Sequence, residues 1–514
     1  MSETFAAIDV GSYELALKIF EISPKKGVKE LDHVRHNIDL GTETYRSGRI
    51  SNVHVEELGH VLEDFVNIMK SYDVTHYQAY GTSAMRETGN IDIVLEQLQQ
   101  KTGLHIDVIS NSEQRFLDYK SIALKNDEFS KIIEKSTAIL DIGGGSIQIS
   151  LFDNDKLVST QNLKLGVLRL YSMMEQLGAS RQKYSLLIKE LVNTQLSVFS
   201  KMYLKDKKIE NIIILDDYVA PIIQKGLLGN KVKGYVKADD IPVFLNNMSM
   251  ATRAQLTKKL NLSEDTIPLV YVSGLLVECI VDMLGAQMLW APGVTLCDGI
   301  AYEYAEKKKI IKLPHDFEQD IIACAQNISK RYMGSKSRSE TLQTIAMNLF
   351  DATKMVHGLS KRDRLLLQIA TILHDCGKYI SMVYLGDCSY NIIMTTEIIG
   401  LSHREREIVA NVVKFNHKDF EYYKGSPELY AKLTHDDYIK IVKLTALLRV
   451  TNGLDRTHKQ KFKNVRFLLK DNKLIITIDS MDDVTLENGL FQNRAAFFEE
   501  VFGVKPVIRQ KREL

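Results

Sequence analysis

The segment STAILDIGGGSIQISLFD, residues 136–153, decides the fold, and FAAIDVGSYELALKIFE, residues 5–21, repeats nearly the same pattern. In each segment an apolar run ends in Asp, one apolar residue and Gly, and a second alternating apolar run follows. Alternating apolar runs are typical of strands, and a glycine between two of them indicates a tight turn. The sequence therefore predicts the same β-hairpin twice.

A glycine that directly follows a strand can bring backbone N–H groups close to an anion, which is one way proteins hold phosphate. The segment DIGGGS supplies such a loop and a hydroxyl, and DVGS supplies a shorter one. Neither segment is a Walker A loop or a GxGxxG dinucleotide motif, since a strand follows each turn. The candidate phosphate-binding residues are Gly11, Ser12, Gly143, Gly144, Gly145 and Ser146.

A purely structural alternative is two ordinary glycine hairpins with aspartate as a turn former. This alternative suits either hairpin alone. It does not explain why Asp9 and Asp141 occupy the same position in both copies. We therefore favour a functional repeat, in which each aspartate offers a ligand for a metal ion or water beside the phosphate.

The overall composition limits the classes of protein. With 514 residues, 45% hydrophobic and 25% charged, the chain is expected to fold into two to four domains. A formal net charge of +1 argues against a surface dominated by nucleic-acid or membrane binding. Five scattered cysteines without a CxxC pair, and no long uninterrupted apolar run, predict a cytoplasmic protein without a membrane span.

The sequence pattern divides the chain into four parts. Strand-like runs alternate with helical periods over residues 1–128 and again over 129–310, which predicts two α/β lobes. Helical periods dominate residues 315–462. The last part, 463–514, reads as a hairpin followed by a helix.

The paired hairpins resemble the two phosphate loops of the actin, sugar-kinase and Hsp70-like fold. Four segments, GTSAMRETGN, VISNSEQRFLDYKSIAL, LDIGGGS and LKLGVLRL, also occur in the order and spacing of the exopolyphosphatase and guanosine pentaphosphate phosphohydrolase family. This resemblance implies two actin-like, ribonuclease H-like lobes, an all-α HD-like domain and a small C-terminal α+β domain.

The resemblance also assigns roles in the first two lobes. Glu113 matches the glutamate that orients or deprotonates the attacking water, and Arg86 matches an arginine that would clamp a phosphate. Asp9, Asp141 and Gln148 would hold Mg²⁺, with Mn²⁺ as the alternative ion. This chain departs from the family pattern at Tyr13, Gln114 and Gln148, which weakens the expected metal site because amides lack the charge that a hard dication prefers.

The helical region contains His374 and Asp375, the dipeptide that names the HD metal-dependent phosphohydrolases. In the family pattern the first histidine position holds Arg338 and the late aspartate position holds Asn452. We therefore expect an HD-like scaffold that binds no catalytic metal. A rearranged site completed by another histidine is the alternative, and the candidates are His357, His403 and His417.

The leading functional hypothesis is an exopolyphosphatase-like hydrolase that removes terminal phosphate from inorganic polyphosphate. Hydrolysis of guanosine pentaphosphate, pppGpp, is the alternative within the same chemistry. A non-catalytic polyphosphate or alarmone sensor is the alternative of another class. An ATP-using kinase of this fold is disfavoured, since LDDYVAP stands where a glycine-rich adenosine loop would follow the third strand. The expected assembly is a homodimer that binds neither nucleic acid nor membrane.

Overall fold

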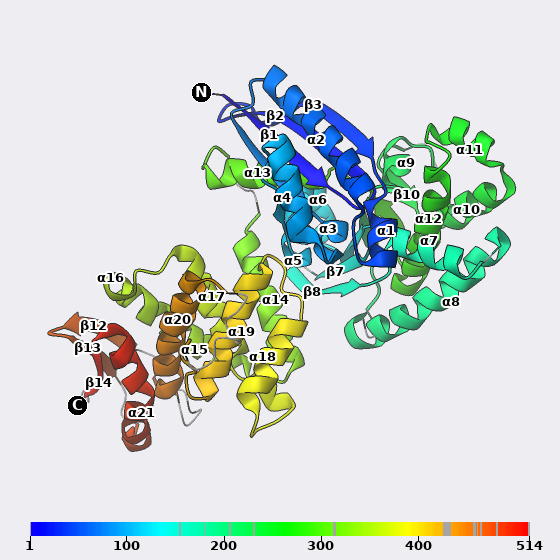
Figure 1. The fold of residues 1–514 in the computed structure, drawn as a ribbon. Coiled ribbons are helices and arrows are strands. Elements are labelled where there is room, and N and C mark those ends of the chain that lie inside the picture. The colour runs from blue at the N-terminus through cyan, green and yellow to red at the C-terminus, as the bar shows by residue number, and fades with distance from the viewer. Residues whose placement is uncertain are drawn as a thin grey trace. The chain divides into compact units, whose positions relative to one another are not determined.

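The structure is a computed structural model of the 514-residue chain (Figure 1). It describes residues 2–153, 156–178, 180–204, 207–229, 232–311, 315–424, 433–455, 459, 461–462, 465–479 and 482–511. The chain forms two compact units, Met1–Asp316 and Phe317–Leu514. Each unit is described by itself.

The first unit begins with a five-stranded sheet in the order β3-β2-β1-β4-β5. Strands β1, β2 and β3 are antiparallel, whereas β4 and β5 run parallel to β1. Its strands are β1 (Glu3–Val10), β2 (Glu14–Ser23), β3 (Gly27–Asn37), β4 (His76–Gly81) and β5 (Asp107–Val108). Its helices are α1 (Leu40–Ser47), α2 (Asn52–Ser71), α3 (Ser83–Glu87), α4 (Ile91–Thr102), α5 (Asn111–Ile122) and α6 (Asn126–Ile133).

The second half of this unit repeats that topology in a six-stranded sheet, ordered β10-β11-β9-β6-β7-β8. Its strands are β6 (Thr137–Ile142), β7 (Ile147–Asp153), β8 (Lys156–Leu163), β9 (Asn211–Asp216), β10 (Tyr235–Lys237) and β11 (Met288–Trp290). Strands β6, β7, β8, β9 and β11 correspond to β1, β2, β3, β4 and β5, and β10 is added at the edge. The internal repeat predicted from the sequence is therefore confirmed at the level of strand order and direction.

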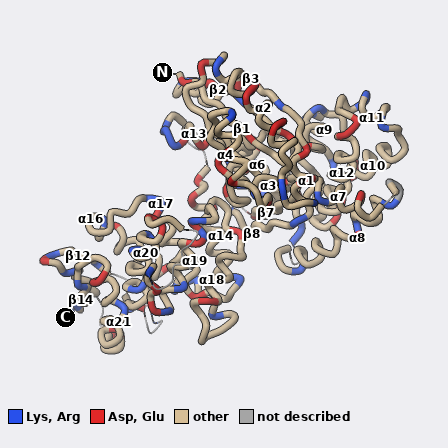
Figure 2. The backbone as a smooth tube through the Cα atoms, viewed as in Figure 1, with Lys and Arg blue, Asp and Glu red and all other residues tan. Residues whose placement is uncertain are grey.

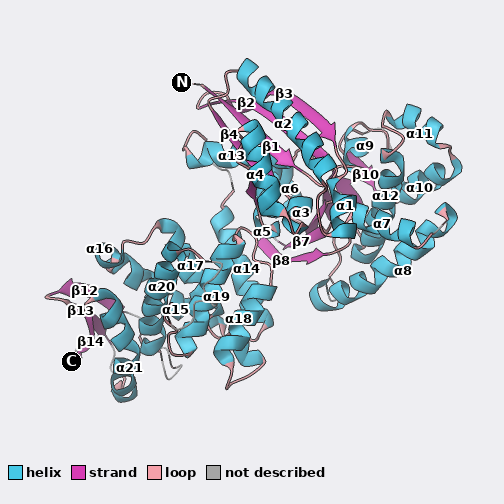
Figure 3. Ribbon diagram, viewed as in Figure 1, coloured by secondary structure: helices cyan, strands magenta, loops and turns pink. Residues whose placement is uncertain are grey.

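The remaining elements of this half are helical (Figure 3). They are α7 (Val167–Gln176), α8 (Arg181–Phe199), η1 (Ser200–Leu204), α9 (Ala220–Gln224), α10 (Asp240–Met250), α11 (Arg253–Leu260), α12 (Thr266–Leu284) and α13 (Leu296–Lys307). Helix α12 is apolar and long enough to cross a membrane by length and composition, but 72% of its apolar window is buried in the unit. Its side chains belong to the core of the second half, so the fold explains its hydrophobicity.

Helix α13 follows the second half in sequence but packs on the first sheet. Its Cys297, Ile300 and Ala301 join Phe5 and Ala7 of β1 in one buried cluster. Lys18 of β2, buried beneath this helix, pairs with Asp298 of α13 at 3.0 Å and with Glu30 of β3 at 2.8 Å. The end of the unit is thereby fixed to its first strands.

The second unit is mainly helical and ends in a three-stranded sheet, ordered β12-β13-β14. Its helices are α14 (Phe317–Arg331), α15 (Lys336–Ala352), α16 (Lys354–His357), α17 (Lys361–Leu373), η2 (Cys376–Tyr379), α18 (Leu385–Thr395), α19 (His403–His417), α20 (His435–Leu454) and α21 (Thr485–Phe502). Its strands are β12 (Val465–Lys470), β13 (Lys473–Asp479) and β14 (Lys505–Lys511). The predicted hairpin at Asp471 and Asn472 is confirmed, and both turn residues have positive φ.

Acidic and basic residues are interspersed along the backbone of both units (Figure 2). This mixed pattern agrees with the near-zero formal net charge. A binding site for an anion must therefore be produced by local geometry, because the overall charge does not supply it.

Candidate active site

Two loops connect the repeated hairpins, and they have the same geometry. Loop 1, residues 11–14, joins β1 to β2, and loop 2, residues 143–146, joins β6 to β7. The N–H of Gly11 donates to the carbonyl of Glu14 at 3.1 Å, and the N–H of Gly143 donates to that of Ser146 at 2.9 Å. Asp9 and Asp141 occupy equivalent positions on the strands that lead into these loops.

The two loops also lie against each other. A Cβ added at Gly144 would stand 3.1 Å from the Cβ of Ser12 and 2.8 Å from Leu168. A side chain at Gly145 would collide with Tyr45 and Ser83 of the first half. No glycine of either loop has positive φ. These positions need glycine because neighbouring atoms approach closely, and unusual backbone torsions play no part.

The start of α7 engages the carbonyl groups of loop 2. The N–H groups of Val167 and Leu168 donate to the carbonyls of Gly143 and Gly144 at 3.1 and 3.0 Å. Within the described part of the chain, no backbone carbonyl accepts from the N–H of Gly144, Gly145 or Ser12. The segment LKLGVLRL thus holds the carbonyls of loop 2 and leaves N–H groups available for an anion.

Polar contacts surround these loops, and those of Arg169 connect the two halves. The hydroxyls of Ser12 and Tyr45 lie 2.8 Å apart, and Tyr45 donates to Ser83 at 2.9 Å. Arg169 donates from Nε to the carbonyl of Gly145 at 3.0 Å and pairs with Glu87 of α3 at 2.7 Å. Its guanidinium also lies over the ring of Tyr45, 4.6 Å from the centroid.

Carboxyl groups gather behind the loops in an acidic cluster, made of Asp9, Glu14, Asp118, Asp141 and Asp217. Burial raises the pKa of Asp9 to about 7, with a further contribution from Glu14. Desolvation, and then the charge of Asp141, raise the pKa of Asp118 well above its usual value. Desolvation, and then Glu14, likewise raise the pKa of Asp217, although solvent reaches its side chain. Burial and mutual repulsion therefore destabilise the ionised forms of these carboxyl groups.

Arg115 of α5 is a site residue that the sequence analysis missed. Its guanidinium is 4% exposed, pairs with Oδ1 of Asp141 and lies 3.8 Å from Asp118. It also approaches Gly143 of loop 2, since a Cβ there would stand 3.4 Å from Nη2. The segment SNSEQR did contain a signal, because Arg115 stands where the family pattern SGxEEA has alanine.

The acidic cluster can be tested against the metal that the resemblance implies. Oδ1 of Asp9 and Oδ2 of Asp141 are buried and have no hydrogen-bond partner. Unpartnered carboxylate oxygens of this kind fit a hard cation such as Mg²⁺. Among the described residues, however, no group of three or more His, Cys, Asp or Glu is placed to hold a metal ion. The residues fit a cation, and Arg115 already supplies part of the charge it would bring.

Gln148, the third candidate ligand, is buried on β7 opposite Asp141. Its Nε2 donates to the hydroxyl of Ser150 at 3.2 Å, which orients the amide. Ser146 is also buried, and its carbonyl closes loop 2. Gln148 can therefore offer at most a neutral carbonyl oxygen to an ion.

Glu113 and Arg86 meet at the N-terminus of α5. Glu113 forms a capping box, in which its Oε2 accepts from the N–H of Ser110 at 2.9 Å. Arg86 donates to the carbonyl of Ile109 at 2.6 Å and to Oδ1 of Asn111 at 2.5 Å. Both side chains thus stabilise the start of α5, in addition to any role toward a ligand.

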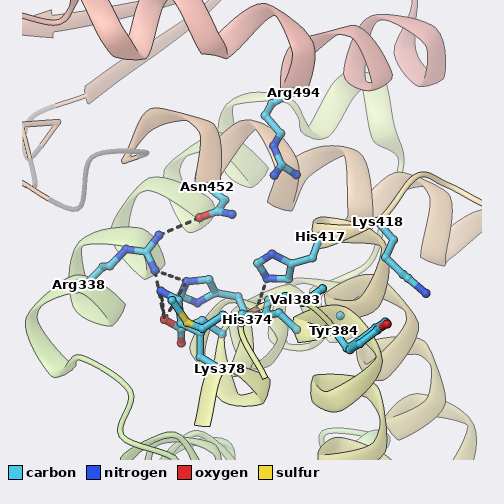
Figure 4. A pocket seen from close by; sticks show the side chains of 13 residues that line it. Arg338, His374, Lys378, Val383, Tyr384, His417, Lys418, Asn452 and Arg494 are labelled. Atoms are coloured by element: carbon cyan, nitrogen blue, oxygen red, sulfur yellow. Dashed lines mark hydrogen bonds and ion pairs between the residues drawn. The ribbon is translucent and has the colours of Figure 1, made fainter. Parts of the chain in front are cut away.

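A second polar pocket lies in the helical unit around His374 (Figure 4). Nη1 of Arg338 lies 2.6 Å from Nε2 of His374 and 3.3 Å from Asp375. The same guanidinium donates to Asp455 at 3.1 Å and to Asn452 at 2.9 Å. Because arginine can only donate, His374 must be neutral, with its proton on Nδ1 facing the carbonyl of Thr371 at 2.8 Å.

The geometry of this pocket supports the expectation that it holds no catalytic metal. The lone pair of His374 that could bind a metal faces a guanidinium, which would repel a dication. Of the alternative histidines, His357 is held by Phe350 and Leu359, and His403 is exposed beside Arg406. His417 does line the pocket, and its Nε2 donates to the carbonyl of His374 at 2.6 Å.

Metal analysis of the full-length protein tests this expectation. We expect no stoichiometric Mn, Fe or Zn after dialysis, and about one equivalent in the double variant Arg338→His, Asn452→Asp, since four N/O ligands, at positions 338, 374, 375 and 452, would then meet. A metal present in the unchanged protein and lost in His374→Ala would contradict the expectation.

Acidification is expected to destabilise the helical unit. Desolvation lowers the pKa of His374 to about 4 and that of His417 to about 3. The unfolded chain therefore takes up these protons at higher pH than the folded chain. The stability due to neutral His374, about 3 kcal/mol, is complete above about pH 6.5 and is lost as the pH falls toward 4.

Urea unfolding at several pH values measures this loss. Far-ultraviolet circular dichroism follows the helices of both units, and the fluorescence of Trp290, the single tryptophan, reports on the first unit alone. A dichroism transition that occurs without a change in Trp290 fluorescence is therefore assigned to the second unit. Asp9 has the opposite sign, because its raised pKa makes the first unit less stable as the pH rises toward 7. His417→Gln should flatten the acid dependence of the second unit and exposed His403→Gln should not. If the urea midpoint of the second unit stays constant between pH 7 and 5, its buried histidines do not have the lowered pKa values described above.

Taken together, two sheets of equal topology with facing glycine loops and a shared acidic cluster define the class of two-lobed, actin-like phosphate-binding proteins. The fold agrees with a solved exopolyphosphatase from Cytophaga hutchinsonii, at a TM-score of 0.51 and 16% identity, over 60% of this chain and all of that one. An exopolyphosphatase-like protein gives a TM-score of 0.50 at 16% identity, over 60% of this chain and 99% of the other.

The sequence matches two families in succession. Residues 19–308 match the Ppx/GppA phosphatase family, and residues 322–495 match domain III of Ppx/GppA phosphatases. The chain belongs to the Ppx/GppA phosphatase family. It is 21% identical to a guanosine-5′-triphosphate,3′-diphosphate pyrophosphatase of Vibrio atlanticus, over 92% of this chain and 91% of that protein. It is 26% identical to exopolyphosphatase 1 of Mycobacterium leprae, over 32% of this chain and 47% of that protein.

Proposed function

We propose that this protein is a phosphoanhydride hydrolase of the exopolyphosphatase type, which removes the terminal phosphate of inorganic polyphosphate. One observation carries the proposal: loops of identical geometry face each other with free N–H groups, beside an acidic cluster that needs a cation. This arrangement can hold a terminal phosphate between the lobes without depending on one particular leaving group.

Individual residues have separate parts in the proposed reaction. The N–H groups of loops 1 and 2 bind the phosphate oxygens, and Arg115 adds a fixed positive charge beside loop 2. Glu113 accepts a proton from the attacking water through Oε1, because its Oε2 is used in the capping box. Mg²⁺, or Mn²⁺, would be held by Asp9 and Asp141 with the carbonyl of Gln148, and would neutralise charge on the phosphate. Arg86 positions the N-terminus of α5.

Hydrolysis of pppGpp is the second candidate. It is favoured by the relative named guanosine-5′-triphosphate,3′-diphosphate pyrophosphatase, whose alignment covers 92% of this chain. A non-catalytic sensor is the third, favoured by Arg115, which reduces the need for a metal. A kinase is disfavoured, because Asp216 uses its carboxylate to cap the N–H groups of Tyr218 and Ala220, where an adenosine loop would stand.

We also propose a finer division of the chain into domains. The lobes comprise residues 1–128 and 129–310, followed by an HD-like scaffold at 315–462 that binds no catalytic metal and a small α+β domain at 463–514. We propose a cytoplasmic homodimer that binds its phosphorylated substrate and neither nucleic acid nor membrane.

Phosphate release from long-chain polyphosphate, pppGpp and ATP, measured in parallel with Mg²⁺, with Mn²⁺ and with chelator, tests the proposal. Preference for polyphosphate would support it, preference for pppGpp would favour the second candidate, and binding without release would favour the sensor. Gly144→Val serves as the blocked control, because the added side chain would collide with Ser12 and Leu168.

A further inference from the structure

The polar pocket of the helical unit has a cationic wall. It encloses about 280 Å³, slightly below the usual range for sites that hold drug-sized ligands. Its lining includes the cations Arg338, Lys378, Lys418 and Arg494, and a single carboxylate, Asp375. The pocket therefore suits a small anion better than a metal ion or a neutral molecule.

The two histidines of the pocket are neutral rings, so neither adds charge to its wall. His374 is neutral because it accepts from Arg338, and His417 uses Nε2 to donate to a carbonyl. Figure 4 shows Arg338 and Arg494 approaching these rings from different elements, α15 and α21. The amide of Asn452 accepts from Arg338 through its oxygen, which leaves its NH₂ group as a further donor at the cavity wall.

Acidic groups offset only part of the positive charge. Asp455 and Asp375 pair with Arg338, and Asp387 pairs with Lys418 at 2.6 Å. Lys378 stands 3.9 Å from Asp375, a carboxylate that already pairs with Arg338. Among the residues that line the pocket, four are cations and one is a carboxylate, so the lining itself is predominantly positive.

An apolar and aromatic rim borders the cationic wall. Met382, Val383 and Tyr384 line the pocket and are 76%, 83% and 66% exposed. Such exposure is costly unless something covers the side chains, and an aromatic ring suits stacking by a planar group. Hydrogen-bond donors beside an exposed aromatic ring would suit the two parts of a phosphorylated organic molecule, its phosphate and a planar group.

We propose that this pocket binds a dianionic phosphate group, free or carried by a small molecule, with the phosphate against Arg338, Lys378 and Arg494 and any planar group on Tyr384. The guanidinium of Arg338, fixed by two carboxylates, an amide and an imidazole, contributes a rigidly held positive charge to the wall, while most of its N–H groups are already used. The site is separate from the loops of the first unit and does not depend on the proposed hydrolase activity.

Acetylation of Lys378, read by mass spectrometry on the full-length protein, locates binding at this pocket and not at the loops. Inorganic phosphate, ribose 5-phosphate and guanosine 5′-monophosphate are the three probes, and exposed Lys354 is the internal control. We expect at least about tenfold slower labelling of Lys378, and about tenfold weaker protection in Arg494→Gln, as for loss of one charge-assisted contact. Arg509→Gln, an exposed arginine of the same unit, should leave protection unchanged.

The outcomes separate the sources of the phosphate. Equal protection by all three probes supports the proposal with phosphate itself as the ligand. Stronger protection by the nucleotide, lost in Tyr384→Ala, supports it with a planar organic group. If Arg494→Gln unfolds, Lys378→Gln read through labelling of Lys418 replaces it. Absence of protection by every probe, or protection that survives both variants, overturns the proposal.

Discussion

Glu113→Gln is expected to lower phosphate release by about 10²-fold or more while leaving polyphosphate affinity nearly unchanged. The structure makes this substitution selective. Oε2 of Glu113 accepts from the N–H of Ser110, and the amide oxygen of glutamine can accept the same bond. The start of α5 should therefore persist, and only the ability to take a proton from water is removed.

Turnover and binding are measured separately, by phosphate release and by equilibrium titration with polyphosphate. Glu57→Gln, an exposed change on α2 of the same unit, is the matched control and should alter neither quantity. Glu113→Ala additionally loses the side-chain bond to the N–H of Ser110, and with it half of the capping box, so it should also weaken the start of α5. Parallel loss of affinity and turnover in Glu113→Gln would show that the residue binds ligand or only supports the helix.

The sequence predicted features that depend on local pattern. The two hairpins follow from alternating apolar runs around Asp and Gly, and their registers place Asp9 and Asp141 as expected. Strands β3 and β8 were not predicted. Strand β3 is largely exposed and charged, and β8 buries Ser159 and Thr160, so neither shows a clear alternation of apolar and polar residues.

Features that depend on contacts between the two halves could not be predicted in the same way. The pairing of Arg115 with Asp141 joins a helix of the first half to a strand of the second, and no spacing in the chain reveals it. The glycines show the same limit. The sequence analysis attributed the glycines of loop 2 to the close approach of an anion, whereas the structure shows that Ser12 and Leu168 also pack closely on Gly144.

The helical pocket lies between these cases. The sequence identified Arg338 and Asn452 as replacements for metal ligands, and the structure shows that Arg338 contacts both Asn452 and His374. Arg494 comes from a helix far along the chain, and only the fold shows that it lines the same cavity. A sequence can show that metal ligands have been replaced, whereas only the three-dimensional structure shows which side chains line the resulting cavity.

Arg115→Ala is expected to make the first unit depend on a divalent cation for its stability. The substitution leaves Asp141 and Asp118 buried without their cation, beside Asp9, whose pKa is already raised by burial. Removing one partner of a buried ion pair typically costs about 3–5 kcal/mol. In chelator, the unfolding midpoint reported by Trp290 should fall accordingly, since that residue lies in this unit.

Mg²⁺ should then restore much of this loss in Arg115→Ala and stabilise the unchanged protein far less, because an ion that binds only the folded state adds more stability the more tightly it binds, in a logarithmic dependence. Arg115→Lys retains a positive charge and should show a smaller loss with little response to Mg²⁺. Arg46→Ala, an exposed change in the same unit, controls for general effects. Equal stabilisation by Mg²⁺ in the unchanged protein and in Arg115→Ala would mean that the guanidinium and the metal ion bind at independent positions. A response confined to Arg115→Ala would show that one cation substitutes for the other at Asp141.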